Sequence, residues 1–302
     1  MTGLIYDEVP GRVSLQYRAD QVHPLITITR PEPEDFVAQL EWVNNYASLR
    51  FERNEEIRVQ RTKFLPYFAM VGVLHPDRMP RTVELLRLLI GVTGTIHYRI
   101  KHALACRRPI EYSPQVQPMI STPGHGSLPS GHATEAFTAA LALDALVRHA
   151  RVSLHSGEEV APTIPNFNPS DPFTVQLLRI AERIAINRQV AGVHFPVDSV
   201  AGMVLAQSVS EFHVARCFKG KPVPRMMDGR GFRGDFSYSD VLESNYKRLP
   251  AAPGQPGVIG SDDVIHVERH EMDIKPSLLL RHLWCQAVVE CARVLGPGQG
   301  QP

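Results

Sequence analysis

Hydrophobic residues recur every three to four positions along most of the chain, the spacing that lines one face of a helix. The pattern predicts helices over 35–60, 64–74, 81–105, 132–149, 172–188 and 197–218, with one more after Pro276. Amphipathic helices of this kind bury their hydrophobic faces against one another. We therefore expect a mainly α fold, a helix bundle of roughly seven helices.

The N-terminal segment and three long loops depart from this pattern. Residues 1–33 alternate between hydrophobic and polar positions and end at Pro31 and Pro33, which predicts a short extended or hairpin arm. Long loops rich in proline or glycine are expected over 110–128, 150–171 and 219–263. Because no linker divides the rest, we expect an extended N-terminal arm over 1–33 and a single all-α domain over 34–302.

Composition narrows the class of protein. The 302 residues contain 32 Lys and Arg against 31 Asp and Glu, and a net charge of +1 gives no global field for nucleic acid or an anionic membrane. The best apolar run, Leu88 to Tyr98, is well short of the roughly 20 residues that span a bilayer. The four cysteines lack Cys-x-x-Cys spacing, and no apolar secretory segment follows the first residues. We expect a cytoplasmic protein with reduced cysteines and no membrane span.

The turn Pro129-Ser130-Gly131-His132 stands directly before a predicted helix. The first N–H groups of a helix have no partner within it, and the macrodipole places positive charge there, so this turn suits an oxyanion. Gly131 permits close approach of the backbone, and the Ser130 hydroxyl can donate a hydrogen bond. By itself, a serine in this position is more often only an N-cap.

Two other segments carry matching chemistry. Lys101 and Arg108 are seven residues apart, and on a continuous helix they would project from nearly the same face. Further along, Arg188 is followed by His194 and then by Asp198, just before another predicted helix. Cations, helix-end amides and imidazoles from three segments are the groups that hold one tetrahedral or trigonal-bipyramidal oxyanion.

In this order, Lys-x6-Arg-Pro, Pro-Ser-Gly-His and Arg-x5-His-x3-Asp resemble the three-part signature of the type 2 phosphatidic acid phosphatase and vanadium haloperoxidase superfamily. The signature runs from Lys101 to Asp198, about a third of the chain, and its segments are 101–109, 129–132 and 187–198. Asn187 stands where the family often has serine, which leaves that supporting contact open. The resemblance implies the helix-bundle core of the soluble branch.

The residues themselves suggest roles for His194 and Asp198. His194 precedes a helix N-terminus, and Asp198 in the first turn can accept the Nδ1 proton, which leaves Nε2 free to attack. The resemblance implies that His132 is the general acid and base. It also implies a set of residues that bind the oxyanion: Lys101, Arg108, Ser130, Gly131 and Arg188.

Three functions remain open at this point. The first is a phosphatase that forms a phosphohistidine on a small phosphoester and needs no cofactor. The second is a haloperoxidase that holds vanadate on His194, its only metal-binding residue, and oxidises halide with hydrogen peroxide. The third, more remote, is an anion-binding scaffold without catalysis. His125 fits either a second histidine beside vanadate or a surface loop.

The stripe of Leu280, Trp284, Val288 and Cys291 after Pro276 bears on possible partners. Residues at this spacing form one hydrophobic face of a helix. The face can pack on the core or pair with a second copy of the chain. A homo-oligomer is therefore an open expectation.

Overall fold

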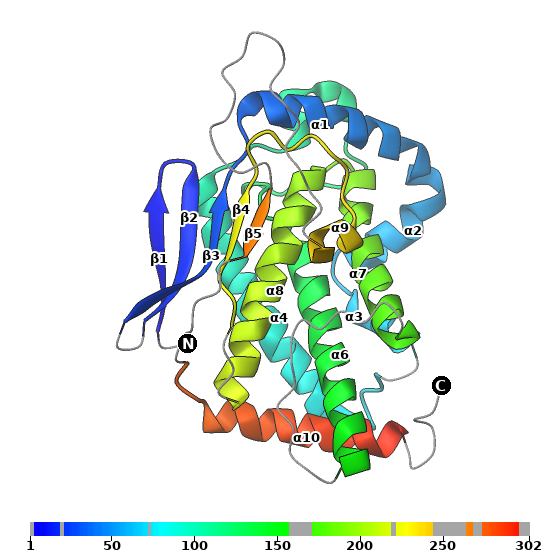
Figure 1. Cartoon of the computed structure of the whole chain (residues 1–302). Helices are drawn as coiled ribbons and strands as arrows, with labels where there is room; N and C mark the ends of the chain where they lie inside the picture. The colour runs from blue at the N-terminus through cyan, green and yellow to red at the C-terminus, as the bar shows by residue number, and fades with distance from the viewer. Residues whose placement is uncertain are drawn as a thin grey trace.

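The structure is a computed structural model, and it describes residues 3–18, 21–71, 74–156, 171–218, 222–243, 264–267 and 274–295. Long helices dominate it, as expected (Figure 1). The four that run along the bundle are α4 (Pro80–Leu104), α6 (Gly131–Ser156), α7 (Pro172–Val190) and α8 (Pro196–Phe218). Helix α10 (Leu278–Leu295) crosses their lower end in Figure 1.

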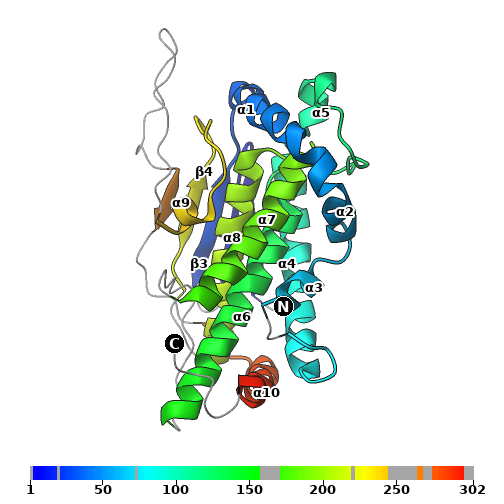
Figure 2. The same cartoon turned by 90° about the vertical axis from the view of Figure 1, so that its right-hand side faces the viewer.

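Helix α8 lies inside the bundle. It contacts α4 and α6 on one side and the sheet on the other, as the two views show (Figure 2). Its small and hydrophobic residues are buried on every face, which is the pattern of a helix that is covered all round. Since α8 begins at Pro196, this burial places the segment around His194 inside the protein.

A mixed sheet corrects the expectation of a purely helical domain with an arm. Strands β1 (Leu4–Val9), β2 (Arg12–Arg18) and β3 (Val22–Thr29) form an antiparallel meander. Strand β4 (Arg225–Asp228) then pairs with β3 in parallel, and β5 (Ile265–Val267) pairs with β4. The arm prediction was incomplete because β4 and β5 are short and their pairing with β3 is a long-range contact that no local pattern reveals. The inward side chains of β2 and β3 share one hydrophobic core with the helices. The boundary between an arm and a domain stays a prediction.

All three predicted loops contain regular structure. Helix α6 continues past residue 149 to Ser156, so the first part of the predicted loop 150–171 is helical, and residues 157–170 lie outside the described chain. The predicted loop 219–263 contains β4 and the short helix α9 (Tyr238–Glu243), and its residues 244–263 also lie outside the described chain. The predicted loop 110–128 begins within the short helix α5 (Pro109–Tyr112) and includes a 3-10 turn, η2 (Pro114–Val116).

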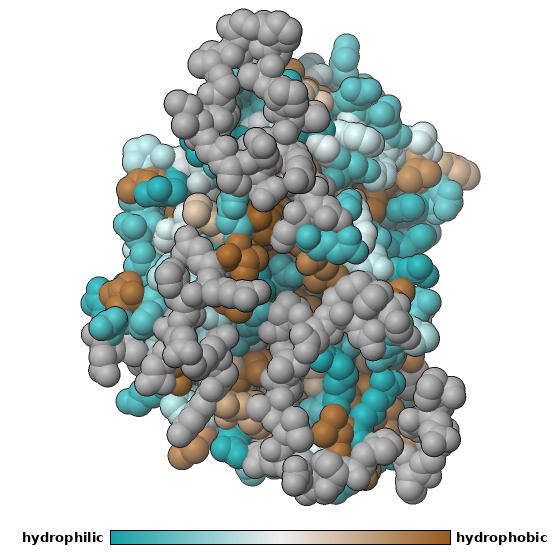
Figure 3. Space-filling model, viewed as in Figure 1, coloured by the Kyte–Doolittle hydropathy of each residue, from teal (hydrophilic) through white to brown (hydrophobic). Residues whose placement is uncertain are grey.

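The predicted helix over 35–60 is divided into two. Helix α1 (Pro33–Tyr46) and helix α2 (Arg50–Gln60) are joined by a 3-10 turn, η1 (Ala47–Leu49), and a short helix α3 (Leu65–Ala69) follows. On the face drawn in Figure 3, hydrophilic residues predominate around α1 and α2, and hydrophobic residues form smaller groups among them. One face of α2 is nevertheless buried: Ile57 and Gln60 are 0% and 1% exposed, although the charge-rich sequence of this helix is typical of a solvated surface.

The hydrophobic stripe of α10 packs within the chain. Trp284, Val288 and Cys291 are buried, and α10 contacts α4, α6 and α8. The hydrophobic stripe of α10 therefore packs on the core of its own chain. None of the four cysteines forms a disulfide bond within the described part of the chain, and three of them are buried: Cys106, Cys217 and Cys291. None of the helices in the described part of the chain combines the length and apolar character needed to cross a membrane.

Candidate active site

The three signature segments meet at the end of the bundle opposite α10. Lys101 lies in the last turn of α4, Arg188 lies in the last turn of α7, and Asp198 lies in the first turn of α8. The turn before α6 enters between them, since the Ser130 amide donates to the Asp198 carbonyl at 2.8 Å. The C-terminal ends of α4 and α7 and the N-terminal ends of α6 and α8 therefore lie together at the site.

His194 and Asp198 form the expected pair. Nδ1 of His194 lies 2.8 Å from Oδ2 of Asp198, and the Phe195 amide donates to the same oxygen at 2.9 Å. Ser127 donates its hydroxyl to the other carboxylate oxygen at 3.4 Å. An ionised carboxylate at Nδ1 selects the tautomer with the proton there, so Nε2 keeps its lone pair. Burial, followed by nearby cations such as Arg108, lowers the pKa of His194 well below its usual value, so the ring is neutral.

Arg108 reaches this imidazole by a route other than the predicted one. Helix α4 ends at Leu104 because Ala105 adopts a left-handed conformation with φ of 48°. Arg108 is therefore in extended backbone beyond the helix, and the expectation that it shares a helical face with Lys101 was wrong. Its NH1 group lies 2.9 Å from Nε2 of His194 and donates to the Val193 carbonyl at 2.7 Å.

Lys101 and Arg108 still meet, through the backbone of the loop before α6. The Lys101 ammonium donates to the carbonyls of Gly126 at 3.2 Å and Ser127 at 2.7 Å. Arg108 donates through NH2 to the same Gly126 carbonyl at 3.1 Å. Burial and the neighbouring Arg108 charge lower the pKa of Lys101 to about 7. Burial raises the pKa of Asp198 to about 6, against the lowering effect of the Phe195 amide and of Lys101.

Arg188 has unused donors. The residue is 1% exposed, and its NH2 group donates to the Ile57 carbonyl at 3.1 Å. Its Nε and NH1 groups are buried and have no hydrogen-bond partner among the described residues. Buried donors are almost always paired, so two unpaired N–H groups on one guanidinium indicate the place of an anion. Burial lowers the pKa of Arg188 to about 10, which leaves it charged near neutrality.

The turn Ser130-Gly131-His132 begins α6. The Ser130 oxygen accepts from the Ala133 amide at 3.4 Å, so this residue is an N-cap whose own proton is still available to donate. His132 is half-buried, and its Nε2 lies 3.2 Å from the Gln60 carbonyl. Burial and the Arg188 charge lower the pKa of His132 to about 3. His132 is thus neutral near pH 7 and donates to the backbone of α2.

Helix α2 is a wall of the site that the signature does not contain. Asn187, the position where the family often has serine, donates to the side chains of Glu56 at 2.9 Å and Gln60 at 2.8 Å. Arg53 in turn donates to the Asn187 oxygen at 3.2 Å. Asn187 therefore ties the Arg188 segment to α2. Sequence reasoning missed Glu56 and Gln60 because a charge-rich helix far from the signature carries no local signal of this contact.

His125 lies on the outer side of Arg108. Its Nδ1 is 3.2 Å from NH2 of Arg108, and its ring meets the ring of Tyr98 edge to face with 4.9 Å between centroids. A cavity of about 450 Å³ opens here and is lined in part by Lys101, Arg108 and His125. The structure thus brings His125 to the site, and its role stays open.

Two further residues beside the site were not predicted. His97 lies on α4 one turn before Lys101, and its Nε2 is 2.9 Å from a carboxylate oxygen of Glu135 on α6. The i, i+4 spacing of His97 and Lys101 was the one available signal in the sequence.

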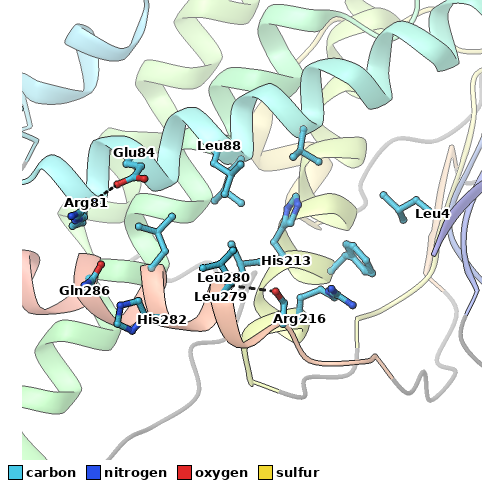
Figure 4. A pocket seen from close by; sticks show the side chains of 15 residues that line it. Leu4, Arg81, Glu84, Leu88, His213, Arg216, Leu279, Leu280, His282 and Gln286 are labelled. Carbon is cyan, nitrogen blue, oxygen red and sulfur yellow. Dashed lines mark hydrogen bonds and ion pairs between the residues drawn. The ribbon is translucent and has the colours of Figure 1, made fainter. Parts of the chain in front are cut away.

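A larger cavity lies elsewhere. It has a volume of about 560 Å³ and lies between the first half of α4, the end of α8 and the start of α10. In Figure 4, Leu88 and Leu280 face it from opposite sides, with His213 on its wall. None of the predicted site residues lines it, because they occupy the other ends of α4 and α8.

The chain matches one family of known proteins over part of its length. Residues 84–217 match the family model described as the PAP2 superfamily. The matched range contains the segments 101–109, 129–132 and 187–198 and leaves out α1, α2 and the N-terminal strands. A search of the curated proteins finds no match.

Proposed function

Because residues 84–217 belong to the PAP2 superfamily, whose members are phosphatases or haloperoxidases, we propose that the chain hydrolyses small phosphoric monoesters through a phosphohistidine on His194. One observation carries the proposal. An unprotonated Nε2 of His194 lies beside Arg108, in a buried site where Arg188 holds two unpaired N–H groups. A nucleophile therefore lies close to buried N–H groups that can donate to an anion.

His194 makes the first attack. Asp198 holds the proton on Nδ1 and stabilises the positive charge that grows on the ring as Nε2 bonds to phosphorus. When the phosphoryl group binds, Arg108 moves its NH1 donation from Nε2 to a phosphoryl oxygen, which frees the Nε2 lone pair to attack. Together with Lys101 and Arg188, it balances the charge on the three equatorial oxygens, where phosphoryl transfer concentrates it.

His132 transfers the protons in both halves of the reaction. A neutral imidazole is too weak an acid for this step, so His132 must first take up a proton from solvent when the substrate anion binds. As the P–O bond to the leaving group breaks, the resulting imidazolium gives this proton to the leaving oxygen. In the second half, His132 accepts a proton from water, whose oxygen attacks phosphorus while the N–P bond breaks. Phosphate leaves, and His194 returns with its Nε2 lone pair. Since His132 donates to the Gln60 carbonyl in the free protein, it must exchange this partner for the leaving oxygen.

The contact between His125 and Arg108 favours one second candidate, a vanadate-dependent haloperoxidase. The unpaired N–H groups of Arg188 fit vanadate as well as phosphate, because vanadate has the shape of the phosphoryl-transfer transition state. His194 would hold it through Nε2, with Lys101, Arg108 and Arg188 around its oxygens. Bound vanadate would supply the oxidation of halide by hydrogen peroxide. We place this function second because it requires a rare oxyanion.

One purified sample tests both functions. Aryl phosphate hydrolysis is assayed first, and peroxide-dependent bromination is assayed after loading with orthovanadate, each beside the His194→Ala variant. We expect hydrolysis by the wild type and a loss of at least about 10³-fold in the variant. Bromination without hydrolysis would overturn the phosphatase in favour of the haloperoxidase, and neither activity would overturn both.

A further inference from the structure

His97 and Glu135 form a buried pair at the edge of the oxyanion site. His97 is 2% exposed and lies one turn before Lys101 on α4, while Glu135 lies one turn after Gly131 on α6. The 2.9 Å contact between His97 Nε2 and Glu135 Oε1 links the two helices that contribute Lys101 and Gly131. No part of the proposed reaction uses either side chain.

The His97 ring fills the space next to Gly131. A Cβ atom added to Gly131 would lie 2.9 Å from Cε1 and 3.1 Å from Nε2 of His97, closer than non-bonded carbon atoms approach. The ring is held in place on other sides as well, by Glu135 and by Tyr98, whose ring centroid is 4.7 Å away. It therefore cannot move aside easily for a side chain at position 131.

Glu135 orients the His97 ring, and its negative charge also acts on Lys101. Burial lowers the pKa of His97, so the ring is neutral and donates its Nε2 proton to the carboxylate. Nδ1 of His97 is then an unprotonated, buried nitrogen with no partner among the described residues. The Glu135 carboxylate is half-buried and close enough to Lys101 to favour its ammonium form.

We propose that His97 and Glu135 are a positioning pair for the oxyanion site, and that the His97 ring, rather than the oxyanion, requires glycine at position 131. The pair fixes the start of α6, with its Gly131 amide and His132, relative to Lys101 on α4. A Cβ at position 131 would push α6 away from α4 and separate the donors. This inference rests on the proposed function, since it assumes that the site binds an oxyanion.

A double-mutant cycle on the full chain tests the steric part. Orthovanadate binding is measured by calorimetry for wild type, Gly131→Ala, His97→Ala and the double variant. We expect Gly131→Ala to weaken binding about tenfold or more when His97 is present, and less than about twofold when residue 97 is alanine. An equal loss in both backgrounds would overturn the proposal, because the oxyanion would then be what excludes the Cβ.

The variant Glu135→Gln tests the electrostatic part and keeps the shape of the pair. The charged and titratable groups that face Lys101 are Arg108, Asp198, Cys106, Glu135 and the neighbouring His97. Removal of the Glu135 charge lowers the pKa of Lys101 further, so the fall in kcat/KM at high pH moves to lower pH. Glu84→Gln is the matched control, because Glu84 is an exposed carboxylate that pairs with Arg81 at the far end of α4. This variant leaves the pH profile unchanged. A Glu135→Gln profile identical to that of the control would contradict the proposal.

The possible failures are distinguishable. If the wild type binds no orthovanadate, the proposed function fails and this inference falls with it. If the wild type binds orthovanadate but the cycle is additive and the pH limb does not move, only the positioning pair is wrong. Thermal melts report the folding of each variant, and Glu135→Gln decides the question alone if the His97 variants do not fold.

Discussion

Arg108 donates to Nε2 of His194 across 2.9 Å, while Asp198 holds the opposite nitrogen of the same ring at 2.8 Å. A guanidinium can only donate, so the nitrogen that it meets must carry a lone pair. The resting imidazole is therefore already in the tautomer that nucleophilic attack requires. The same contact means that Arg108 must turn its NH1 hydrogen bond from Nε2 to a substrate oxygen when an oxyanion arrives.

The first prediction concerns the tautomer. Asp198→Asn keeps the shape of the carboxylate but loses its charge, so it no longer stabilises the positive ring, and its amide group can favour the wrong tautomer. We expect kcat for aryl phosphate to fall by about 10³ to 10⁴ with a smaller change in KM. Steady-state kinetics checks this, with the exposed Asp77→Asn as control. A loss confined to KM would show that Asp198 acts only in binding.

The second prediction concerns Lys101 and pH. Its pKa lies at about 7, so the ammonium is present below pH 7 and is lost as the pH rises through that value. Sulfate stays doubly charged across this range, so only the protein titrates. We expect the calorimetric Kd for sulfate to rise above pH 7 and to level off on the acid side.

Two variants at this position serve as controls. Lys101→Arg keeps its charge at all these pH values and should abolish the rise in Kd. Lys101→Met should bind sulfate weakly at every pH. A wild-type Kd that does not change between pH 6 and pH 8 would contradict the assignment of Lys101 to the site.

The third prediction concerns Asn187. Replacement by alanine leaves the buried Gln60 oxygen without its donor and removes one of the donors to Glu56. We expect the free energy of unfolding to fall by about 1 to 3 kcal/mol. Urea denaturation measures this, and Asn54→Ala on α2, whose side-chain hydrogen bonds to Glu55 and Arg58 are exposed, is the matched control. Equal stability of the two variants would refute the structural role of Asn187.

The fourth prediction concerns the glycine before His194. Gly192 has φ of +77°, and a Cβ there would lie 2.8 Å from NH2 of Arg50 and 3.3 Å from the Pro118 backbone. Gly192→Ala should cost about 1 to 3 kcal/mol of stability. Gly91→Ala, in α4 with no atom near the added Cβ, should instead stabilise by about 0.5 to 1 kcal/mol. The opposite signs in thermal melts check both statements, and a neutral Gly192→Ala would contradict the first.

The sequence predicted the long helices and the residues that meet at the site better than it predicted how they meet. Helices α4, α7 and α8 follow uninterrupted periodicity, so their ends, which carry Lys101, Arg188 and Asp198, could be placed closely. The shared helical face of Lys101 and Arg108 was wrong because a left-handed residue at Ala105 ends α4 early. Their meeting depends on the Gly126 carbonyl, a contact across the fold.

Contacts between distant segments explain the other differences. Strand β4 has four residues and no alternating pattern, and it exists because β3 offers an edge to pair with. Gln60 is buried only because Asn187 and His132 approach it from α7 and α6. A charge-rich helix considered alone gives no sign of such partners. Residues that are buried by distant segments can be identified only from the folded structure.

The central claim is that His194 carries the phosphoryl group. The most direct measurement is mass spectrometry of protein mixed with an aryl phosphate and quenched in alkali, where phosphohistidine survives. We predict one added phosphoryl group on the peptide that contains His194 in the wild type, and none in His194→Ala. The Asp198→Asn variant, which slows the chemistry but retains the nucleophile, should still be labelled at longer times. Turnover by the wild type with the label on another residue, or with hydrolysis unchanged in His194→Ala, would contradict the account.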